Sequence, residues 1–119
     1  MATINKTIEY VDGVKVNAYD EEAKYKWLSE LDGLISREVM QRDEPVEYRF
    51  PDDGDRELLV GAPYDAIYPL YMEAQIDFHN REYGNYNNTI LMFNSKLDDY
   101  KKAYIRDNMP KSHGDFKFK

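Results

Sequence analysis

The sequence predicts an all-α fold of about four helices, because apolar side chains recur in it at helical spacing. One stripe near the end of the chain alternates spacings of four and three residues, the period of one helix face; it consists of Tyr86, Ile90, Phe93, Leu97, Tyr100 and Tyr104. A second stripe precedes a Gly84-Asn85 break and consists of Ile67, Tyr71, Ala74 and Phe78. Two amphipathic helices joined by a short turn pack antiparallel, so we expect a long C-terminal helical hairpin.

Two shorter helices are expected before the hairpin. Thr3 is placed to cap a first helix that ends near Gly13, with Ile4, Ile8 and Val11 on one face. Asp20 can cap a second helix that should run from Glu21 to about Gln41. Its apolar face consists of Trp27, Leu28, Leu31, Leu34, Ile35 and Val39. Gly33 interrupts this pattern, which predicts close approach of a neighbouring helix at that point.

Residues 43–57, here called the acidic loop, separate this helix from the hairpin. The segment contains Pro45, Pro51 and seven acidic residues against two arginines, which gives −5 of the chain's net charge of −7. One interpretation is a solvated connection, because charge blocks usually face water. The other is a functional projection, because long loops in compact domains are uncommon and often bind partners. The alternation of Val46, Tyr48 and Phe50 suits a short strand or an extended arm.

Prolines mark the expected bounds of the hairpin. Pro63 suits the first turn of the third helix. Pro69 then predicts a kink or a restart near Tyr68, because proline removes a backbone hydrogen bond. We expect regular helix from Leu70 to about Tyr83 and a fourth helix from about 85 to 107. The predicted core consists of Trp27, Leu28, Leu31, Ile35, Ile67, Tyr71, Ala74, Phe78, Ile90, Phe93 and Leu97.

Composition limits the classes of function. The 119 residues contain no cysteine, which excludes disulfides and thiolate chemistry. A net charge of −7 argues against general nucleic-acid binding and against docking on anionic membranes. No apolar run is long enough to span a bilayer, and the start of the chain lacks the apolar core of a signal peptide. We expect one intracellular domain over residues 1–110, followed by a flexible, extended C-terminal tail over residues 111–119.

The only cluster that suggests catalysis lies on the third helix and consists of Glu73, Asp77, His79 and Glu82. Di-metal bundles need a Glu-x-x-His motif from each of two helices, whereas here the order is reversed and no second helix supplies a histidine. Asp77 and Arg81 are spaced for an ordinary ion pair. The serines lack a suggestive histidine partner, and no glycine-rich phosphate loop occurs. We therefore expect a binding protein rather than an enzyme, without cofactor or metal.

Candidate interaction residues come from three segments. Tyr48 and Phe50 belong to the acidic loop, and Phe116 and Phe118 alternate in the C-terminal tail, which has a net charge of +2. Such a tail is either frayed or docked on another surface. Asn94 lies in the middle of the fourth helix, where its amide could bond across helices or between subunits.

Several segments together resemble a family of small proteins encoded in the structural gene clusters of tailed phages and Gram-positive prophages. The resemblance covers most of residues 20–110 and is carried by Lys26-Trp27-Leu28-Ser29-Glu30-Leu31-Asp32-Gly33, Leu58-Leu59-Val60, Pro63-Tyr64-Asp65, Tyr71-Met72-Glu73-Ala74-Gln75-Ile76-Asp77, Tyr86-Asn87-Asn88 to Phe93-Asn94, and Met109-Pro110. These proteins are usually taken as head-tail connector, or adaptor, proteins. The resemblance implies a mostly α-helical chain that forms a ring beneath the portal and extends the DNA channel.

The resemblance also implies partners. They would be a portal protein, a tail-side connector or stopper protein, and further copies of this chain in a homo-oligomeric ring. The location would be the virion, and the host cytoplasm during assembly. Because adaptor rings commonly form only against a template, we expect the isolated chain to be monomeric or weakly associated. DNA would pass without specific binding, because an acidic wall repels phosphates. The alternative is a small acidic phage-encoded regulator that binds and sequesters a host protein.

Overall fold

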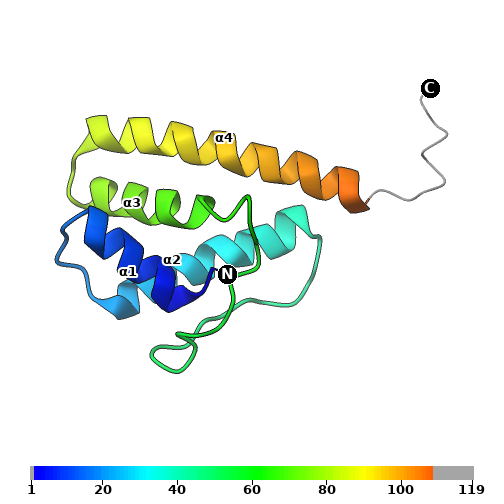
Figure 1. Ribbon diagram of the computed structural model, residues 1–119, viewed down its shortest axis with the longest axis horizontal. Coiled ribbons are helices and arrows are strands. Elements are labelled where there is room, and N and C mark those ends of the chain that lie inside the picture. The colour runs from blue at the N-terminus through cyan, green and yellow to red at the C-terminus, as the bar shows by residue number, and fades with distance from the viewer. Residues whose placement is uncertain (1, 109–119) are drawn as a thin grey trace.

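The computed structural model describes residues 2–108, and within them the fold is all-α (Figure 1). Its elements are α1 (Ile4–Val14), α2 (Glu21–Leu34), a π-helical segment (Ile35–Val39), α3 (Ile67–His79) and α4 (Tyr83–Asn108). The described residues hold no strand, and Thr3 and Glu57 form an isolated antiparallel bridge. The predicted fold class is therefore confirmed. The expected C-terminal tail lies outside the described residues.

The helix starts follow the sequence signals. The Thr3 hydroxyl accepts a hydrogen bond from the Lys6 amide at 3.2 Å at the start of α1. The Asp20 carboxylate accepts one from the Ala23 amide at 2.9 Å at the start of α2. Each cap satisfies a backbone donor that has no partner inside the helix. Ile4 is fully buried, as the α1 stripe predicts.

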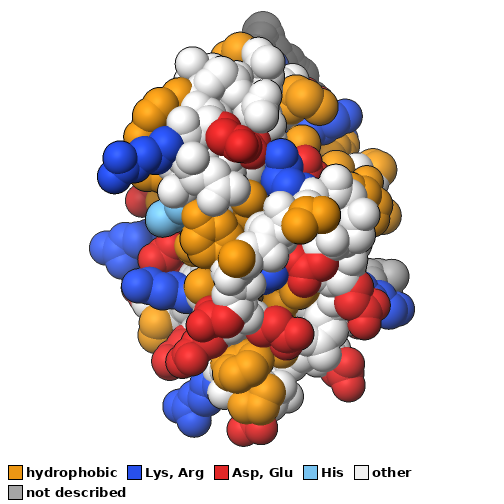
Figure 2. Space-filling model, turned by 90° about the vertical axis from the view of Figure 1, so that its left-hand side faces the viewer, with side chains coloured by type: hydrophobic (Ala, Val, Ile, Leu, Met, Phe, Trp, Pro, Cys, Tyr) orange, Lys and Arg blue, Asp and Glu red, His pale blue; other side chains and the backbone are white. Residues whose placement is uncertain are grey.

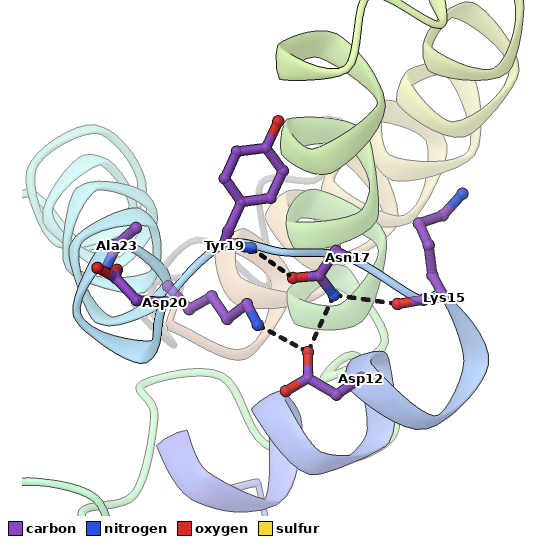
Figure 3. A network of polar contacts seen from close by, with 7 residues as sticks. Asp12, Lys15, Asn17, Tyr19, Asp20 and Ala23 are labelled. Carbon is purple, nitrogen blue, oxygen red and sulfur yellow. Dashed lines mark hydrogen bonds and ion pairs between the residues drawn. The ribbon is translucent and has the colours of Figure 1, made fainter.

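The connection from α1 to α2 is ordered by polar side chains (Figure 3). Asn17 donates from Nδ2 to the Asp12 carboxylate at 3.1 Å and to the Lys15 carbonyl at 3.0 Å. Its own side-chain oxygen accepts from the Tyr19 amide at 3.2 Å. Lys24 of α2 donates to the same Asp12 oxygen at 2.8 Å. These bonds fix the angle between the two helices.

The C-terminal end of α2 differs from the prediction of regular helix to Gln41. The α-helix ends at Leu34 and the chain continues through the π-helical segment, which ends at Val39; Gln41 then takes a φ of 57°. Leu34 is 54% exposed rather than buried in the core. No atom outside its own helix lies within 4 Å of a Cβ placed on Gly33, so the expected close approach of another helix there is wrong.

Helices α3 and α4 form the predicted antiparallel hairpin (Figure 1). The turn lies at residues 80–82 and not at Gly84-Asn85, because Arg81 takes the left-handed conformation with a φ of 61° and Gly84 already belongs to α4. Pro63 precedes α3 instead of opening it, since α3 begins at Ile67. Pro69 therefore sits in the first helical turn, where a missing N–H costs no intrahelical bond. The predicted kink or restart near Tyr68 is instead the start of α3, because residues 61–66 are not helical.

The core includes a face of α3 that the sequence stripe does not contain. Tyr68, Met72 and Ile76 are fully buried at spacings of four, whereas Phe78, predicted to be buried, is 49% exposed. The reason is the position of α3 between α4 on one side and α1 and α2 on the other (Figure 1). A helix packed on both sides buries two faces, and an analysis of one stripe finds only one of them. Most other predicted core residues are buried or half-buried.

Candidate interaction surface

One flank of α4 carries a second periodic set of side chains, turned away from α3. They alternate spacings of four and three residues, are all exposed, and are here called the lateral stripe: Asn87, Leu91, Asn94, Asp98, Lys101 and Ile105. Leu91 is 66% exposed and Ile105 is 58% exposed. Large apolar side chains that recur on the exposed flank of a long helix are typical of a contact surface. The lateral stripe is therefore the first candidate site.

A groove lies beside the lateral stripe, between α4 and the C-terminal end of α2. This apolar groove has a volume of about 260 Å³ and is lined by Leu34, Ile35, Glu38, Val39, Leu97 and Lys101. The π-helical segment supplies half of its lining. π-Helical turns are rare and frequently occur at functional sites. The groove and the stripe share Lys101, so they form one continuous surface.

A second, wider groove lies on the opposite side of the fold, between α2 and the acidic loop. This acidic groove has a volume of about 750 Å³ and is lined by Asp20, Glu22, Ala23, Tyr25, Lys26, Ser29, Glu47, Tyr48, Arg49 and Phe50. Phe50 is 43% exposed and packs edge-on against the Tyr25 ring, with 5.0 Å between ring centroids. Figure 2 shows acidic side chains beside hydrophobic ones over the lower half of one face of the molecule.

The acidic loop is built into the fold. The Asn5 amide donates to the Gly54 carbonyl at 2.9 Å, and the Leu58 amide donates to the Ala2 carbonyl at 3.0 Å. A Cβ at Gly54 would lie 2.2 Å from the Asn5 side chain, so that side chain would have to move to admit any larger residue. The acidic side chains of the loop are nearly all exposed, as the interpretation as a solvated connection expects, but its backbone is bonded to α1 and does not form a free extended arm. It is a fixed, charged surface beside α1.

A buried carboxylate holds one residue of this loop and two residues of the chain that follows it. Asp32 of α2 is fully buried and accepts hydrogen bonds from the Tyr48 hydroxyl, from the Tyr68 hydroxyl at 2.7 Å and from the Leu59 amide at 3.0 Å. The Tyr68 hydroxyl in turn accepts from the Val60 amide at 2.8 Å. Burial raises the pKa of Asp32, and the three donors partly offset this effect. Burial and the nearby carboxylate also raise the pKa of Tyr48 and of Tyr68.

Sequence reasoning missed this network, although a signal was present. Asp32 falls on the apolar face of α2, between Leu31 and Ile35. An acidic residue at such a position is rarely buried unless donors surround it. Its donors come from positions 48, 59 and 68. No local pattern indicates those distant partners.

The predicted interaction residues have different environments. Asn94 is exposed and belongs to the lateral stripe, and Phe50 is exposed at the rim of the acidic groove. Tyr48 is only 5% exposed, so its proposed role as a surface contact is corrected to that of a core residue. Its hydroxyl donates to the buried Asp32, and the Arg56 guanidinium carbon lies 5.2 Å from the centroid of its ring. Phe116 and Phe118 lie outside the described residues.

The acidic cluster on α3 is divided among separate contacts. Asp77 is fully buried and pairs with Lys15 at 2.9 Å, rather than with Arg81 as its spacing predicted. This hydrogen bond raises the pKa of Lys15, whereas burial raises the pKa of Glu73. His79 stacks on Trp27 with 5.6 Å between ring centroids. Among residues 2–108, no group of three or more candidate ligands is arranged to hold a metal ion.

Comparisons of the chain with protein-family models, with curated proteins and with solved structures find no match. Within the part of the chain that the structure describes, no helix combines the length and the apolar character needed to cross a membrane.

Proposed function

We propose that this chain is a structural virion protein, a head-tail connector that forms a homo-oligomeric ring beneath a phage portal protein and extends the DNA channel. The observation that carries the proposal is the lateral stripe with the apolar groove beside it. In the isolated chain this surface leaves Leu34, Leu91 and Ile105 more than half exposed. Burying such side chains on association is favourable, so the surface suits a protein partner.

A ring also requires two different patches on each subunit, because its interface is head-to-tail. The helix α4, which carries the lateral stripe, and the acidic loop, which lines the acidic groove, lie on opposite sides of the fold (Figure 1). The stripe and the groove differ in chemistry as well, since the first carries Leu91 and Ile105 among polar side chains and the second carries Asp20, Glu22 and Glu47 beside two cations. Two unlike patches on opposite sides support a closed ring of repeated contacts.

The fixed acidic loop supports the channel role. A surface with seven acidic residues against two arginines would repel DNA phosphates. Repulsion would let the duplex slide through the ring, whereas a basic wall would retain it. DNA therefore passes without being bound, and the binding partners are the portal protein, the tail-side connector or stopper protein, and neighbouring copies.

Co-assembly with a phage portal protein tests the proposal. The chain should sediment with portal rings, whereas a Leu91→Lys/Ile105→Lys variant should lose most of that association. Met92→Lys is a matched control, because Met92 is 57% exposed on α4 but lies off the stripe. A wild-type chain that never sediments with the portal contradicts the connector function. A stripe variant that sediments equally well contradicts only the role of the stripe.

A further inference from the structure

The lateral stripe of α4 is symmetric about one of its residues, Asp98. Leu91 precedes Asp98 by seven residues, and Ile105 follows it by seven. At 1.5 Å per residue, each apolar side chain lies about 10.5 Å from Asp98 along the helix axis. Positions seven residues apart drift by only about 20° around a helix, so the three side chains lie nearly on one line. The stripe therefore presents an apolar contact at the same distance on each side of its centre.

These side chains are open to contact in the isolated chain. Leu91 is 66% exposed and Ile105 is 58% exposed. Asp98 pairs with Lys102 of its own helix at 3.1 Å, but both side chains of this pair are more than half exposed. Such an exposed ion pair adds little stability and can rearrange. Lys101 is exposed as well, and among residues 2–108 no carboxylate lies at ion-pair distance from it.

We propose that two copies of this chain pair through their lateral stripes as an antiparallel, two-fold dimer centred on Asp98. A two-fold interface needs a self-complementary patch, in which residue i of one copy meets residue j of the other and j meets i. Reversing the stripe about Asp98 places Leu91 of each copy level with Ile105 of the other. One apolar contact then forms on each side of the axis, and each contact is favourable because it removes apolar surface from water.

The charges at the centre of the stripe favour the same register. Lys101 lies three residues from Asp98, which is about 4.5 Å along the helix axis. In the antiparallel pair, the Lys101 ammonium of each copy is therefore within reach of the other copy's Asp98 carboxylate. A parallel pair would instead set each lysine level with the same lysine of the other copy. Opposite charges placed across two helices fix their orientation in this way, and Lys102 offsets the repulsion between the two Asp98 carboxylates near the axis.

The contact is small, so the dimer should be weak. The stripe supplies two large apolar side chains from each copy, and small interfaces are typical of transient association. One consequence rests on the proposed function: the pairing covers, in the free chain, the stripe that the ring would use. A two-fold pair is closed and cannot grow into a ring, so contact with a portal must first open it.

Single cysteines test the geometry, since the natural chain contains no cysteine. A disulfide requires Cα atoms within about 7 Å of each other. Asp98→Cys places both thiols at the axis, so this variant should form covalent dimers on oxidation. Leu91→Cys alone and Ile105→Cys alone separate like thiols by about 21 Å along the axis, so neither should crosslink. An equimolar mixture of these two variants should crosslink, because their thiols lie level with each other.

Met92→Cys is the matched control for random collision, because Met92 is 57% exposed on α4 but lies off the stripe. Asp98→Cys should oxidise at least about tenfold faster than this control, since paired thiols meet at an effective concentration of the order of millimolar. Equal rates for the two variants would refute contact at the axis. Rapid crosslinking of Leu91→Cys alone would refute the antiparallel orientation. A mixture of Leu91→Cys and Ile105→Cys that reacts no faster than either variant alone would refute the register.

An exchange of charges then tests the contact at the centre by sedimentation equilibrium. Asp98→Lys and Lys101→Asp each set like charges across the axis, so each should lower the association constant by about tenfold, since two attractive pairs become repulsive. A mixture of the two single variants should regain association, because every pair then joins a lysine to an aspartate. The Asp98→Lys/Lys101→Asp double variant should regain it for the same reason.

Single variants that associate as strongly as the natural chain, or mixtures that do not recover, would contradict the charge contact. A natural chain that remains monomeric at about 1 mM would refute the dimer altogether. All of these measurements use the isolated chain without a portal. A failure here is therefore distinct from a failure of the connector function, which co-assembly with a portal measures.

Discussion

Replacing Tyr68 with phenylalanine tests whether the buried Asp32 network holds the acidic loop to the helices. The Tyr68 hydroxyl donates to Asp32 at 2.7 Å and accepts from the Val60 amide at 2.8 Å, and the residue is fully buried. A lost hydrogen bond to a charged group costs about 1.5–3 kcal/mol, and a buried donor left without an acceptor costs about 1–3 kcal/mol. Tyr68→Phe should therefore reduce the free energy of unfolding by about 3–5 kcal/mol.

The assay is urea unfolding followed by the fluorescence of Trp27, the single tryptophan of the chain. Tyr10→Phe is the matched control, because Tyr10 is 58% exposed, and its loss of stability should stay within about 0.5 kcal/mol. Tyr48→Phe removes one donor to Asp32 and should fall between the two. A Tyr68→Phe variant no less stable than the Tyr10→Phe control would refute the view that this network anchors the loop.

The remaining predictions concern packing, backbone and pH. Phe93→Ala should cost about 3–5 kcal/mol, because this ring is only 6% exposed and packs against Tyr71; an unchanged thermal midpoint would mean that the wrong face of α4 is assigned to the core. Gly33→Ala should stabilise the chain by about 0.5–1 kcal/mol in urea unfolding, because open space surrounds a Cβ there; a loss of stability would indicate a close neighbour. Burial raises the pKa of the Asp32 carboxyl above its ordinary value of 3.8. The free energy of unfolding of the natural chain, relative to that of Asp32→Asn, should therefore fall as the pH rises from 3.8 through the raised pKa. Urea unfolding at several pH values measures this difference, and a difference that stays constant would contradict the prediction.

The local sequence was sufficient to predict the helices and their starts. Thr3 and Asp20 cap α1 and α2 as expected, because a capping side chain bonds to amides only a few residues away. The α4 stripe likewise depends on spacing within one element. Its inward residues, including Phe93 and Tyr100, are buried where that spacing places them.

Features that depend on distant residues could not be predicted from the sequence. The second buried face of α3 exists because α1 and α2 cover it, and nothing in positions 67–79 states which helices will be neighbours. Asp32 illustrates the same limit, since its donors lie 16, 27 and 36 residues away. The sequence does not show that Asp32 is the partner of Tyr48, and it therefore predicts Tyr48 as a surface contact. In the structure Tyr48 donates to Asp32 and is only 5% exposed.

The candidate surfaces were only partly visible in the sequence. Asn94 is predicted as an interaction residue because asparagine is a weak helix former and lies here in the middle of a helix. The lateral stripe contains it. The apolar groove was missed, because it lies between α4 and the segment after Leu34 where the chain changes from α-helix to π-helix. No residue type in the sequence marks that change in helical form.

The most direct test of the connector function is electron microscopy of portal particles assembled with the full-length chain. The account predicts a closed ring of density beneath the portal, coaxial with its channel. It further predicts that a chain lacking residues 111–119 still folds but gives fewer or incomplete rings. Portal particles that carry no added density in the presence of the full-length chain would contradict the connector function.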